Sequence, residues 1–150
     1  MLKSKLYALT LILAVLALLA TACAETSPVP EPVPTNDLED TRWILESYGE
    51  PGNLQSVMEG TEITAVFDGA EAQVHGSAGC NSYSGDYQIS NNELSIPVIA
   101  QTEMYCLEPE GVMEQEYQYL KTLQTAESYQ VQAGKLQINC GDQILVYTAE

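Results

Sequence analysis

The sequence contains few positive charges. Only five of its 150 residues are lysine or arginine, against 21 aspartates and glutamates, which gives a formal net charge of −16. Lys3 and Lys5 lie at the N-terminus, so the rest of the chain has only Arg42, Lys121 and Lys135 as basic residues. Binding to nucleic acid or to anionic lipid through a basic patch needs clustered lysine and arginine. The composition therefore excludes both kinds of binding surface.

Metal-binding and catalytic residues are also scarce. His75 is the only histidine, and no two of the four cysteines form a CxxC pair. Zinc sites need clusters of cysteine and histidine, and no segment has the D-x-D-x-D-G spacing of a calcium loop. A regular strand would place His75 and Cys80 on opposite faces, and no third residue that would orient such a pair is evident. We therefore expect no catalytic residue, no metal and no cofactor.

No hydrophobic run is long enough to span a membrane. The longest, residues 6–20, has about 15 residues, whereas a transmembrane helix needs roughly 18 to 20. It follows two lysines and precedes Thr21-Ala22-Cys23, which is the order of a secretory signal. Residues 19–23 resemble a bacterial lipobox, except that Ala20 stands where leucine is usual. The sequence therefore predicts a lipoprotein signal peptide over residues 1–22, with simple secretion or a retained helix as alternatives.

Cys23 is accordingly the expected site of lipidation. Two acyl chains hold a protein stably on a membrane, so a diacylglyceryl group on Cys23 would anchor the chain. Residues 24–37 contain four of the seven prolines and no aromatic residue. This composition favours an extended, semi-rigid segment without a core, although a proline-rich ligand for a partner protein is an alternative. We expect a lipidated cysteine and tether over residues 23–38, and one folded domain over residues 39–150 in the cell envelope, facing the periplasm or the exterior.

Short segments of alternating polarity, separated by turn residues, predict a domain rich in strands. The predicted strands span residues 42–48, 62–67, 72–76, 83–89, 94–96, 98–102, 129–132, 135–139 and 143–147. His75 is expected on such a strand, near the surface.

One segment has a helical period instead. Its apolar residues share one stripe at spacings of three and four: Val112, Met113, Tyr117, Leu120 and Leu123. This pattern predicts one amphipathic helix near residues 109–124, with the acidic run over residues 108–116 as its solvated start. Because helix and sheet each have one apolar face to bury, we expect an α+β fold in which a curved antiparallel β-sheet packs on this helix.

Several short motifs follow one another along the predicted domain. They are Thr41-Arg42-Trp43-x-Leu45, GSAGCNSYSG over residues 76–85, Tyr87, Thr102-x-Met104-x-Cys106, Met113-Glu114-x-Glu116-Tyr117, and a closing hairpin over residues 136–147. Together they resemble the META domain, also called the HslJ-like domain, with Tyr105 and Cys140 as departures from its pattern.

The resemblance implies a strongly curved sheet, or cracked barrel, that wraps one helix. It also implies an envelope protein, often a lipoprotein, linked to stress tolerance and to motility or secretion, with no settled catalytic mechanism. We therefore expect a non-enzymatic, lipid-anchored protein that contacts an envelope protein partner. The alternative is a module that holds a small hydrophobic ligand or a lipid between sheet and helix.

The GSAGCNSYSG segment contains the candidate site residues. Its glycines permit positive φ or close backbone approach, and asparagine suits a turn. A tightly packed corner is the favoured interpretation. The alternative is a ligand or partner loop formed by Gly76, Ser77, Gly79, Asn81, Tyr83 and Gly85.

Three cysteines remain once Cys23 is assigned to the lipid. An exported protein keeps its disulfides, and three thiols allow one bridge. Cys80 with Cys106 is the leading pair and would close a loop of about 26 residues. Pairing of Cys140 with either of them is the alternative.

Overall fold

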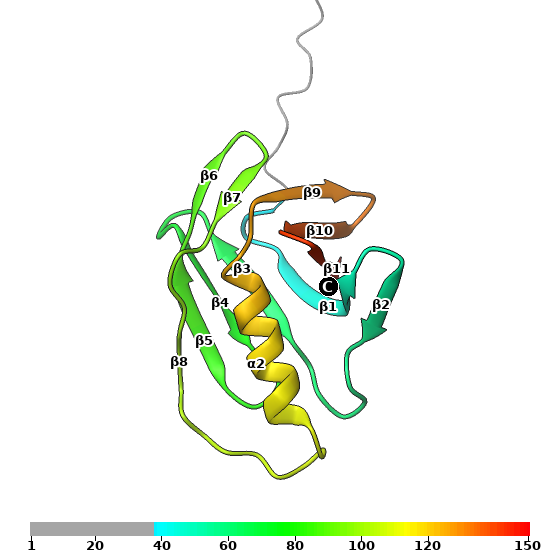
Figure 1. Cartoon of the computed structure of the whole chain (residues 1–150). Coiled ribbons are helices and arrows are strands. Elements are labelled where there is room, and N and C mark those ends of the chain that lie inside the picture. Colours follow the sequence, from blue (N-terminus) through cyan, green and yellow to red (C-terminus); the bar gives the residue numbers. More distant parts are fainter. Residues whose placement is uncertain (1–37) are drawn as a thin grey trace, which may run out of the picture. The chain divides into compact units, whose positions relative to one another are not determined.

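The computed structural model describes residues 38–150 (Figure 1). The expected signal peptide, Cys23 and the tether up to residue 37 lie outside the described residues. Leu38, assigned to the tether from the sequence, is fully buried, and its carbonyl oxygen accepts a hydrogen bond from Trp43 Nε1 at 2.9 Å. Within residues 38–150, no helix combines the length and apolarity needed to cross a membrane.

The described part contains eleven strands, joined in one sheet, and a single helix. The strands are β1 (Arg42–Glu50), β2 (Asn53–Ser56), β3 (Thr64–Asp68), β4 (Gln73–Ser77), β5 (Ser82–Asp86), β6 (Gln88–Ser90), β7 (Glu93–Ser95), β8 (Ala100–Gln101), β9 (Ser128–Gln132), β10 (Lys135–Cys140) and β11 (Gln143–Ala149). The helix is α2 (Val112–Leu123). All pairings between these strands are antiparallel, in the order β6-β7-β9-β10-β11-β1-β3-β4-β5-β8, and β2 pairs with β1.

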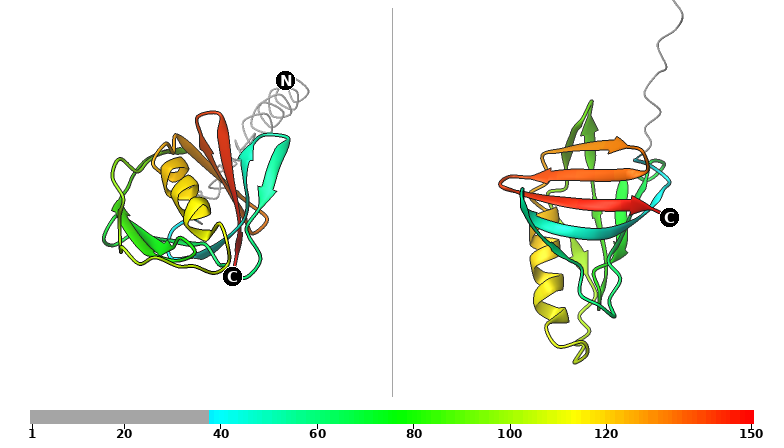
Figure 2. Two further views of the ribbon diagram at one scale, coloured as in Figure 1. Left: turned by 60° about the horizontal axis from the view of Figure 1, so that its bottom comes forward. Right: turned by 90° about the vertical axis from the view of Figure 1, so that its right-hand side faces the viewer.

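The sheet curls into a half-barrel, and α2 lies on its concave side (Figures 1 and 2). A register shift between Leu45 and Ser47 in β1 marks a bulge in the pairing with β11. Bulges bend a strand and increase its twist, so this one contributes to the curvature. The α+β prediction, with an antiparallel sheet packed on one helix, is confirmed at this level.

Alternating side chains build the core between sheet and helix. Ile63, Ala65 and Phe67 are all fully buried, as their alternation predicts. The largest buried side chains are Trp43, Tyr119, Tyr147 and Phe67. They come from β1, α2, β11 and β3, so a single core joins the helix to the middle of the sheet.

The helix differs from its prediction in its start and its buried face. It begins at Val112 instead of near residue 109, with Gly111 as the N-cap at φ +95°. Tyr117 was expected in the buried stripe but is 61% exposed, whereas Glu116 was expected in solvent but is only 2% exposed. Both expectations are wrong because hydrogen-bond partners for Glu116, described below, draw that side of α2 inward. The buried residues are Val112, Gln115, Glu116, Tyr119, Leu120 and Leu123.

Two strand predictions also need correction. Residues 83–89 form two strands because β5 pairs with β4 and β8 whereas β6 pairs with β7, so the chain changes partners at Tyr87. Residues 98–102 contain only the two-residue β8. The hairpin arm β2 was not predicted, since its four residues are all exposed and have no apolar alternation.

Candidate functional site

The glycines of the GSAGCNSYSG segment allow close packing of backbone. A Cβ atom on Gly76 would lie 2.0 Å from the carbonyl oxygen of Thr64, and one on Gly85 would lie 2.4 Å from that of Val98. Real Cβ atoms do not approach oxygen so closely, so no other residue fits at either position without a backbone shift. Both glycines therefore support the packed-corner interpretation of this segment.

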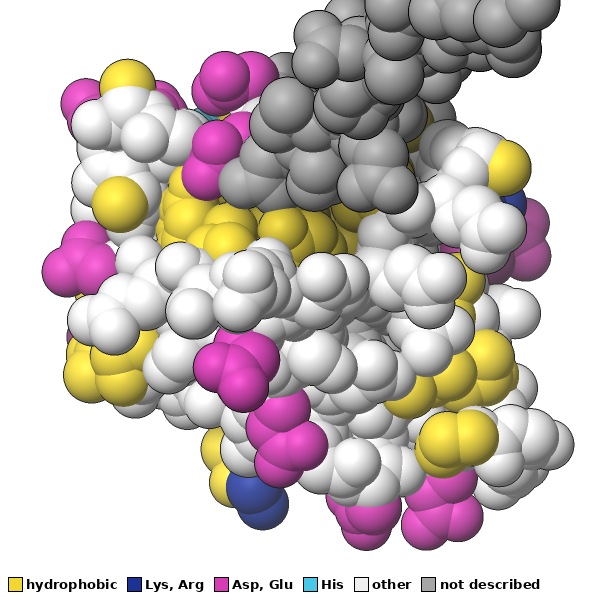
Figure 3. Space-filling view, turned by 90° about the horizontal axis from the view of Figure 1, so that it is seen from above, with side chains coloured by type: hydrophobic (Ala, Val, Ile, Leu, Met, Phe, Trp, Pro, Cys, Tyr) yellow, Lys and Arg dark blue, Asp and Glu magenta, His cyan; other side chains and the backbone are white. Residues whose placement is uncertain are grey.

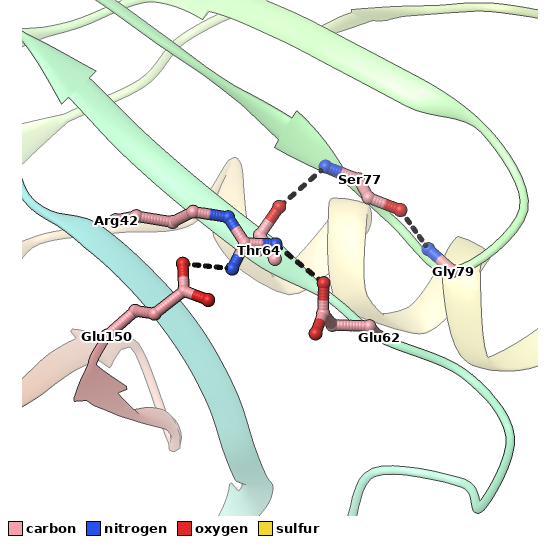
Figure 4. Close-up of polar contacts among 6 residues, drawn as sticks. All are labelled: Arg42, Glu62, Thr64, Ser77, Gly79 and Glu150. Carbon is pink, nitrogen blue, oxygen red and sulfur yellow. Dashed lines mark hydrogen bonds and ion pairs between the residues drawn. The ribbon is translucent and has the colours of Figure 1, made fainter.

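The turn after β4 is held by side-chain hydrogen bonds. The backbone N–H of Ser77 donates to Thr64 Oγ1 at 3.0 Å, and the N–H of Gly79 donates to Ser77 Oγ at 3.2 Å (Figure 4). Gly79 has φ +114°, a backbone conformation that favours glycine. Gly76, Ser77 and Gly79 are therefore brought together, but as parts of a turn.

Asn81 and Glu116 form the centre of a buried polar cluster. The Glu116 carboxylate accepts hydrogen bonds from the N–H groups of Cys80 at 3.2 Å and Asn81 at 2.7 Å. It also accepts a bond of 2.7 Å from Asn81 Nδ2. Burial of a carboxylate is costly unless it is hydrogen-bonded, and these three donors meet that need. The helix and the turn are thereby joined through a single side chain.

The amide of Asn81 extends this cluster to the connection between β8 and α2. Its Oδ1 atom accepts hydrogen bonds of 2.7 Å from Thr102 Oγ1 and from the N–H of Met104. Its Nδ2 atom donates to the carbonyl oxygen of Met104 at 3.0 Å. We call Asn81, Glu116, Thr102 and Met104 the Asn81 cluster. Because Asn81 bonds both the N–H and the carbonyl oxygen of Met104, the cluster fixes the backbone path between β8 and α2.

The disulfide between Cys80 and Cys106 ties the same connection to the turn. The structure contains this bridge, with the two Cα atoms 6.0 Å apart, so the leading pairing from the sequence is the one formed. Cys140 is the free cysteine of the described part and is buried. Burial, with a smaller contribution from Glu127, raises the pKa of its thiol to about 12. A thiol with that pKa is unreactive near neutral pH.

Tyr83 belongs to a buried chain of hydroxyl groups. Its hydroxyl donates to the carbonyl oxygen of Thr64 at 2.9 Å and lies 2.7 Å from the hydroxyl of Tyr119, which accepts from Tyr147 at 3.2 Å. Because the single proton of Tyr83 goes to Thr64, Tyr119 is the donor in the contact between the two tyrosines. Burial raises the pKa of all three hydroxyl groups well above 10. Tyr83 is thus a packing residue and does not form part of a surface loop.

Large apolar side chains are exposed beside these buried groups. We call five of them the apolar patch, with their exposed fractions: Val98 68%, Met104 57%, Tyr105 77%, Leu107 77% and Tyr117 61%. Met104, Tyr105 and Leu107 lie on the connection that the Asn81 cluster and the disulfide hold. Val98 lies just before β8, and Tyr117 lies on α2. A groove of about 390 Å³ runs between β8 and α2, lined in part by Ile99, Met113 and Leu120. Such a surface can bind an apolar partner through contact.

The few cations lie in defined contacts. Arg42 pairs with Glu62 at 2.6 Å and with Glu150 (Figure 4). Lys135 pairs with Glu46 at 2.6 Å. Lys121 Nζ lies 5.8 Å from the centroid of the Tyr117 ring. Acidic side chains spread over the face shown in Figure 3, where few lysine or arginine side chains are seen. Among residues 38–150, no three His, Cys, Asp or Glu side chains are grouped so as to hold a metal ion.

Sequence reasoning missed several residues of this site. It placed Glu116 in solvent, and it gave Thr102 and Met104 no separate role. The spacing contained a signal for Glu116, because it lies four residues after Val112 and four before Leu120, on one helical face. The exposure of Tyr105 and Leu107 could not be predicted from a periodic pattern, because the segment from residue 102 to residue 111 has no regular strand or helix.

Comparison with known proteins extends over most of the chain. The sequence profile of the META domain matches residues 36–150. Heat shock protein HslJ of Escherichia coli (strain K12) is 26% identical over 132 residues, which cover 88% of this chain and 89% of that protein. An NMR structure of a protein from Burkholderia xenovorans has a TM-score of 0.65 at 25% identity, covering 87% of this chain and 96% of that one. These matches confirm the resemblance inferred from the motifs.

A further likeness concerns the fold alone. A crystal structure of a DUF4847 family protein from Bacteroides vulgatus has a TM-score of 0.53 at 11% identity. The match covers 74% of this chain and 93% of that one. The half-barrel with one helix therefore occurs with very different sequences, so function has to be argued from the site and not from the fold.

Proposed function

The chain belongs to the META domain family, and from this premise we propose a non-enzymatic protein that is held in the cell envelope by a lipid on Cys23. It acts through contacts with other envelope proteins, in stress tolerance or secretion. The relative from Escherichia coli has the name heat shock protein, which supports the stress role. The order of lysines, apolar run and Cys23 in the sequence supports the anchor.

The apolar patch is the observation that carries the proposal. Exposed apolar side chains are common singly, but a group of large ones on one segment marks an interaction site. Met104 and its neighbours Tyr105 and Leu107 lie on backbone that Cys106 and Asn81 hold in place. A held segment loses little conformational freedom on binding, which favours association. The backbone that carries Met104, Tyr105 and Leu107 is therefore already ordered without a partner.

A small hydrophobic ligand or a lipid is the second candidate. The groove between β8 and α2, lined in part by Ile99, Met113 and Leu120, is the observation that favours it. Native mass spectrometry of the full chain, purified in a mild detergent, tests this candidate. A bound mass that disappears when Leu120 or Ile99 is replaced by a larger polar residue would support it, and protein free of ligand in every preparation would contradict it.

Site-specific cross-linking in the native membrane tests the main proposal. A photoreactive phenylalanine analogue at Tyr105 should give one recurrent protein adduct, whereas the same analogue at Gln130, exposed on β9, should give none. The variant Cys23→Ser should leave the membrane fraction and lose the adduct. Only monomer from Tyr105, with no recurrent partner, would contradict a function through protein contacts.

A further inference from the structure

We propose that the apolar patch docks an apolar segment of a partner protein that also contains lysine or arginine. This inference rests on the proposed function and adds the chemistry of the partner. Two properties of the surface lead to it: large exposed apolar side chains, and carboxylates that accompany them along the same stretch of chain.

The apolar patch meets a groove at Tyr117. Tyr117 belongs to the apolar patch and also lines the groove between β8 and α2. Ile99, next to Val98 in sequence, lines the same groove. The N–H of Cys106 contacts Met113 Sδ at 3.4 Å, so the connection lies against the first turn of α2. An extended or helical segment can therefore contact the patch and place apolar side chains in the groove.

Carboxylates border this apolar surface. We call Glu103, Glu108, Glu110 and Glu114 the acidic rim; all four are exposed, three on the connection and one in the first turn of α2. Two of the three lysine and arginine side chains of the described part do not offset the rim, because Arg42 and Lys135 are paired with other glutamates. Lys121 is one turn of helix beyond Tyr117, with its Nζ 5.8 Å from the ring centroid, so this one cation adjoins the patch and leaves the four carboxylates of the rim in excess. A partner with positive charges beside apolar side chains complements this surface.

The negative charge of the acidic rim also disfavours two other possible occupants, a second copy of this chain and an anionic bilayer. A second copy of this chain would bring its own acidic rim against the first, and like charges across an interface disfavour association. An anionic bilayer surface would be repelled for the same reason. A cationic protein segment satisfies both the apolar and the charged part of the surface, and we commit to it.

Variants matched in charge separate this surface from the general acidity of the chain. The rim variant replaces the acidic rim by glutamine at all four positions. The control variant makes an equal charge change at four exposed sites away from the patch, with the substitutions Asp40→Asn, Glu71→Gln, Glu93→Gln and Glu127→Gln. Both are made in the full chain with the photoreactive analogue at Tyr105, and the yield of the protein adduct in the native membrane is measured.

The expected result is a loss of adduct of about tenfold for the rim variant and less than about twofold for the control, because nearby charge governs the association rate. Mass spectrometry of the adduct should identify a partner segment with a net positive charge. A synthetic peptide of that segment then serves as the probe for binding to the full chain in detergent. Its affinity should fall as salt is raised, and fall again in the double variant Tyr105→Ser, Leu107→Ser.

Failure of this inference is distinguishable from failure of the proposed function. An adduct to a neutral or acidic segment, to lipid or to a second copy overturns the inference. The same holds if the rim and control variants give equal yields. An adduct to a neutral segment of another envelope protein would leave the proposed function standing. Absence of any protein adduct from Tyr105 would end both.

Discussion

The inward face of α2 buries two polar side chains, whereas its outward face exposes a large aromatic one, which is the opposite of what the polarity of these side chains predicts. Facing the sheet, the helix buries Gln115 and Glu116 next to Tyr119 and Leu120. Facing away, it exposes Tyr117. The inward polar groups are all bonded: Gln115 accepts from the N–H of Met58 at 2.7 Å and donates to Thr61 Oγ1 at 3.0 Å. In the described part, no fully buried side-chain nitrogen or oxygen atom lacks a hydrogen bond.

The contrast shows that available partners decide which side of this helix is buried. Glu116 is buried because the turn at Cys80 and Asn81 offers three N–H donors to its carboxylate. Tyr117 is exposed because the orientation of the helix that buries Glu116 directs Tyr117 away from the core. The inward face therefore determines fold stability, and the outward face is left for contact with a partner. Variants on the two faces should separate stability from binding.

The largest effect is expected from the substitution Glu116→Ala on the inward face. It would leave three N–H groups around Cys80 and Asn81 without their acceptor in a buried site. Loss of hydrogen bonds to a carboxylate, with the donors left unsatisfied, should lower the free energy of unfolding by about 4 kcal/mol. Urea denaturation of the full chain in detergent, followed by tryptophan fluorescence of Trp43, measures this change.

Two variants give the controls for this prediction. Glu116→Gln keeps one acceptor oxygen in place and should cost about half as much. Glu114→Ala, on the exposed side of the same turn, should change stability by less than about 0.5 kcal/mol. Equal stabilities for Glu116→Ala and Glu114→Ala would show that the Asn81 cluster contributes nothing.

Removal of the disulfide should have the next largest effect. The double variant Cys80→Ser, Cys106→Ser opens a bridge between residues 26 apart in sequence. In the chain-entropy account, this lowers the free energy of unfolding by about 3.5 kcal/mol. Wild-type protein treated with a thiol reductant should unfold at the same urea concentration as the double variant.

The same double variant separates the covalent tie from the hydrogen bonds. The hydrogen bonds from Asn81 to the N–H and the carbonyl oxygen of Met104 involve neither cysteine, so we expect them to form without the bridge. The adduct from Tyr105 should therefore persist in the double variant while the protein remains folded. Its complete loss in folded protein would mean that the disulfide alone positions the apolar patch.

The sequence was informative where regular periods exist. Alternation placed Ile63, Ala65 and Phe67 in the core, and the turn residues separated most strands correctly. The ordered motifs identified the family and, with it, a curved antiparallel sheet with one helix. These features depend on local pattern, because the side-chain period of a strand is fixed by its backbone.

The candidate site was less predictable because it depends on contacts between distant segments. Glu116 contacts Asn81 across 35 positions of sequence, and no local pattern reports such a contact. The helical spacing of apolar residues placed Tyr117 in the core, and the acidic run placed Glu116 in solvent; both assignments were wrong. The apolar patch shows the same difficulty, since the irregular connection that holds Tyr105 has no period from which exposure could be inferred.

A smaller effect is expected at the centre of the hydroxyl chain on the inward face. Tyr119→Phe leaves the Tyr147 hydroxyl without the acceptor that it has in the wild type. It also removes the donor to Tyr83. Unfolding should become easier by about 2 kcal/mol. The control Tyr117→Phe, on the exposed face, should be neutral within about 0.5 kcal/mol.

The hydroxyl chain also predicts a dependence on alkaline pH. Burial raises the pKa of Tyr119 in the folded state well above 10, its value in the unfolded chain. Above pH 10 the folded state therefore binds more protons than the unfolded state. Stability is at its full value below pH 10 and is lost as pH rises further. Urea midpoints measured across this range should fall less steeply for Tyr119→Phe, and equal slopes would contradict this assignment.

The smallest effect on stability is expected on the outward face, where the effect on binding should be largest. Tyr117→Ser removes an exposed ring, so the free energy of unfolding should change by less than about 0.5 kcal/mol. The same change deletes part of the apolar patch and one wall of the groove. The adduct from Tyr105 should therefore decrease while the urea midpoint stays in place. If both stayed unchanged, the outward face of α2 would have no part in partner binding, and the patch would be limited to the connection after β8.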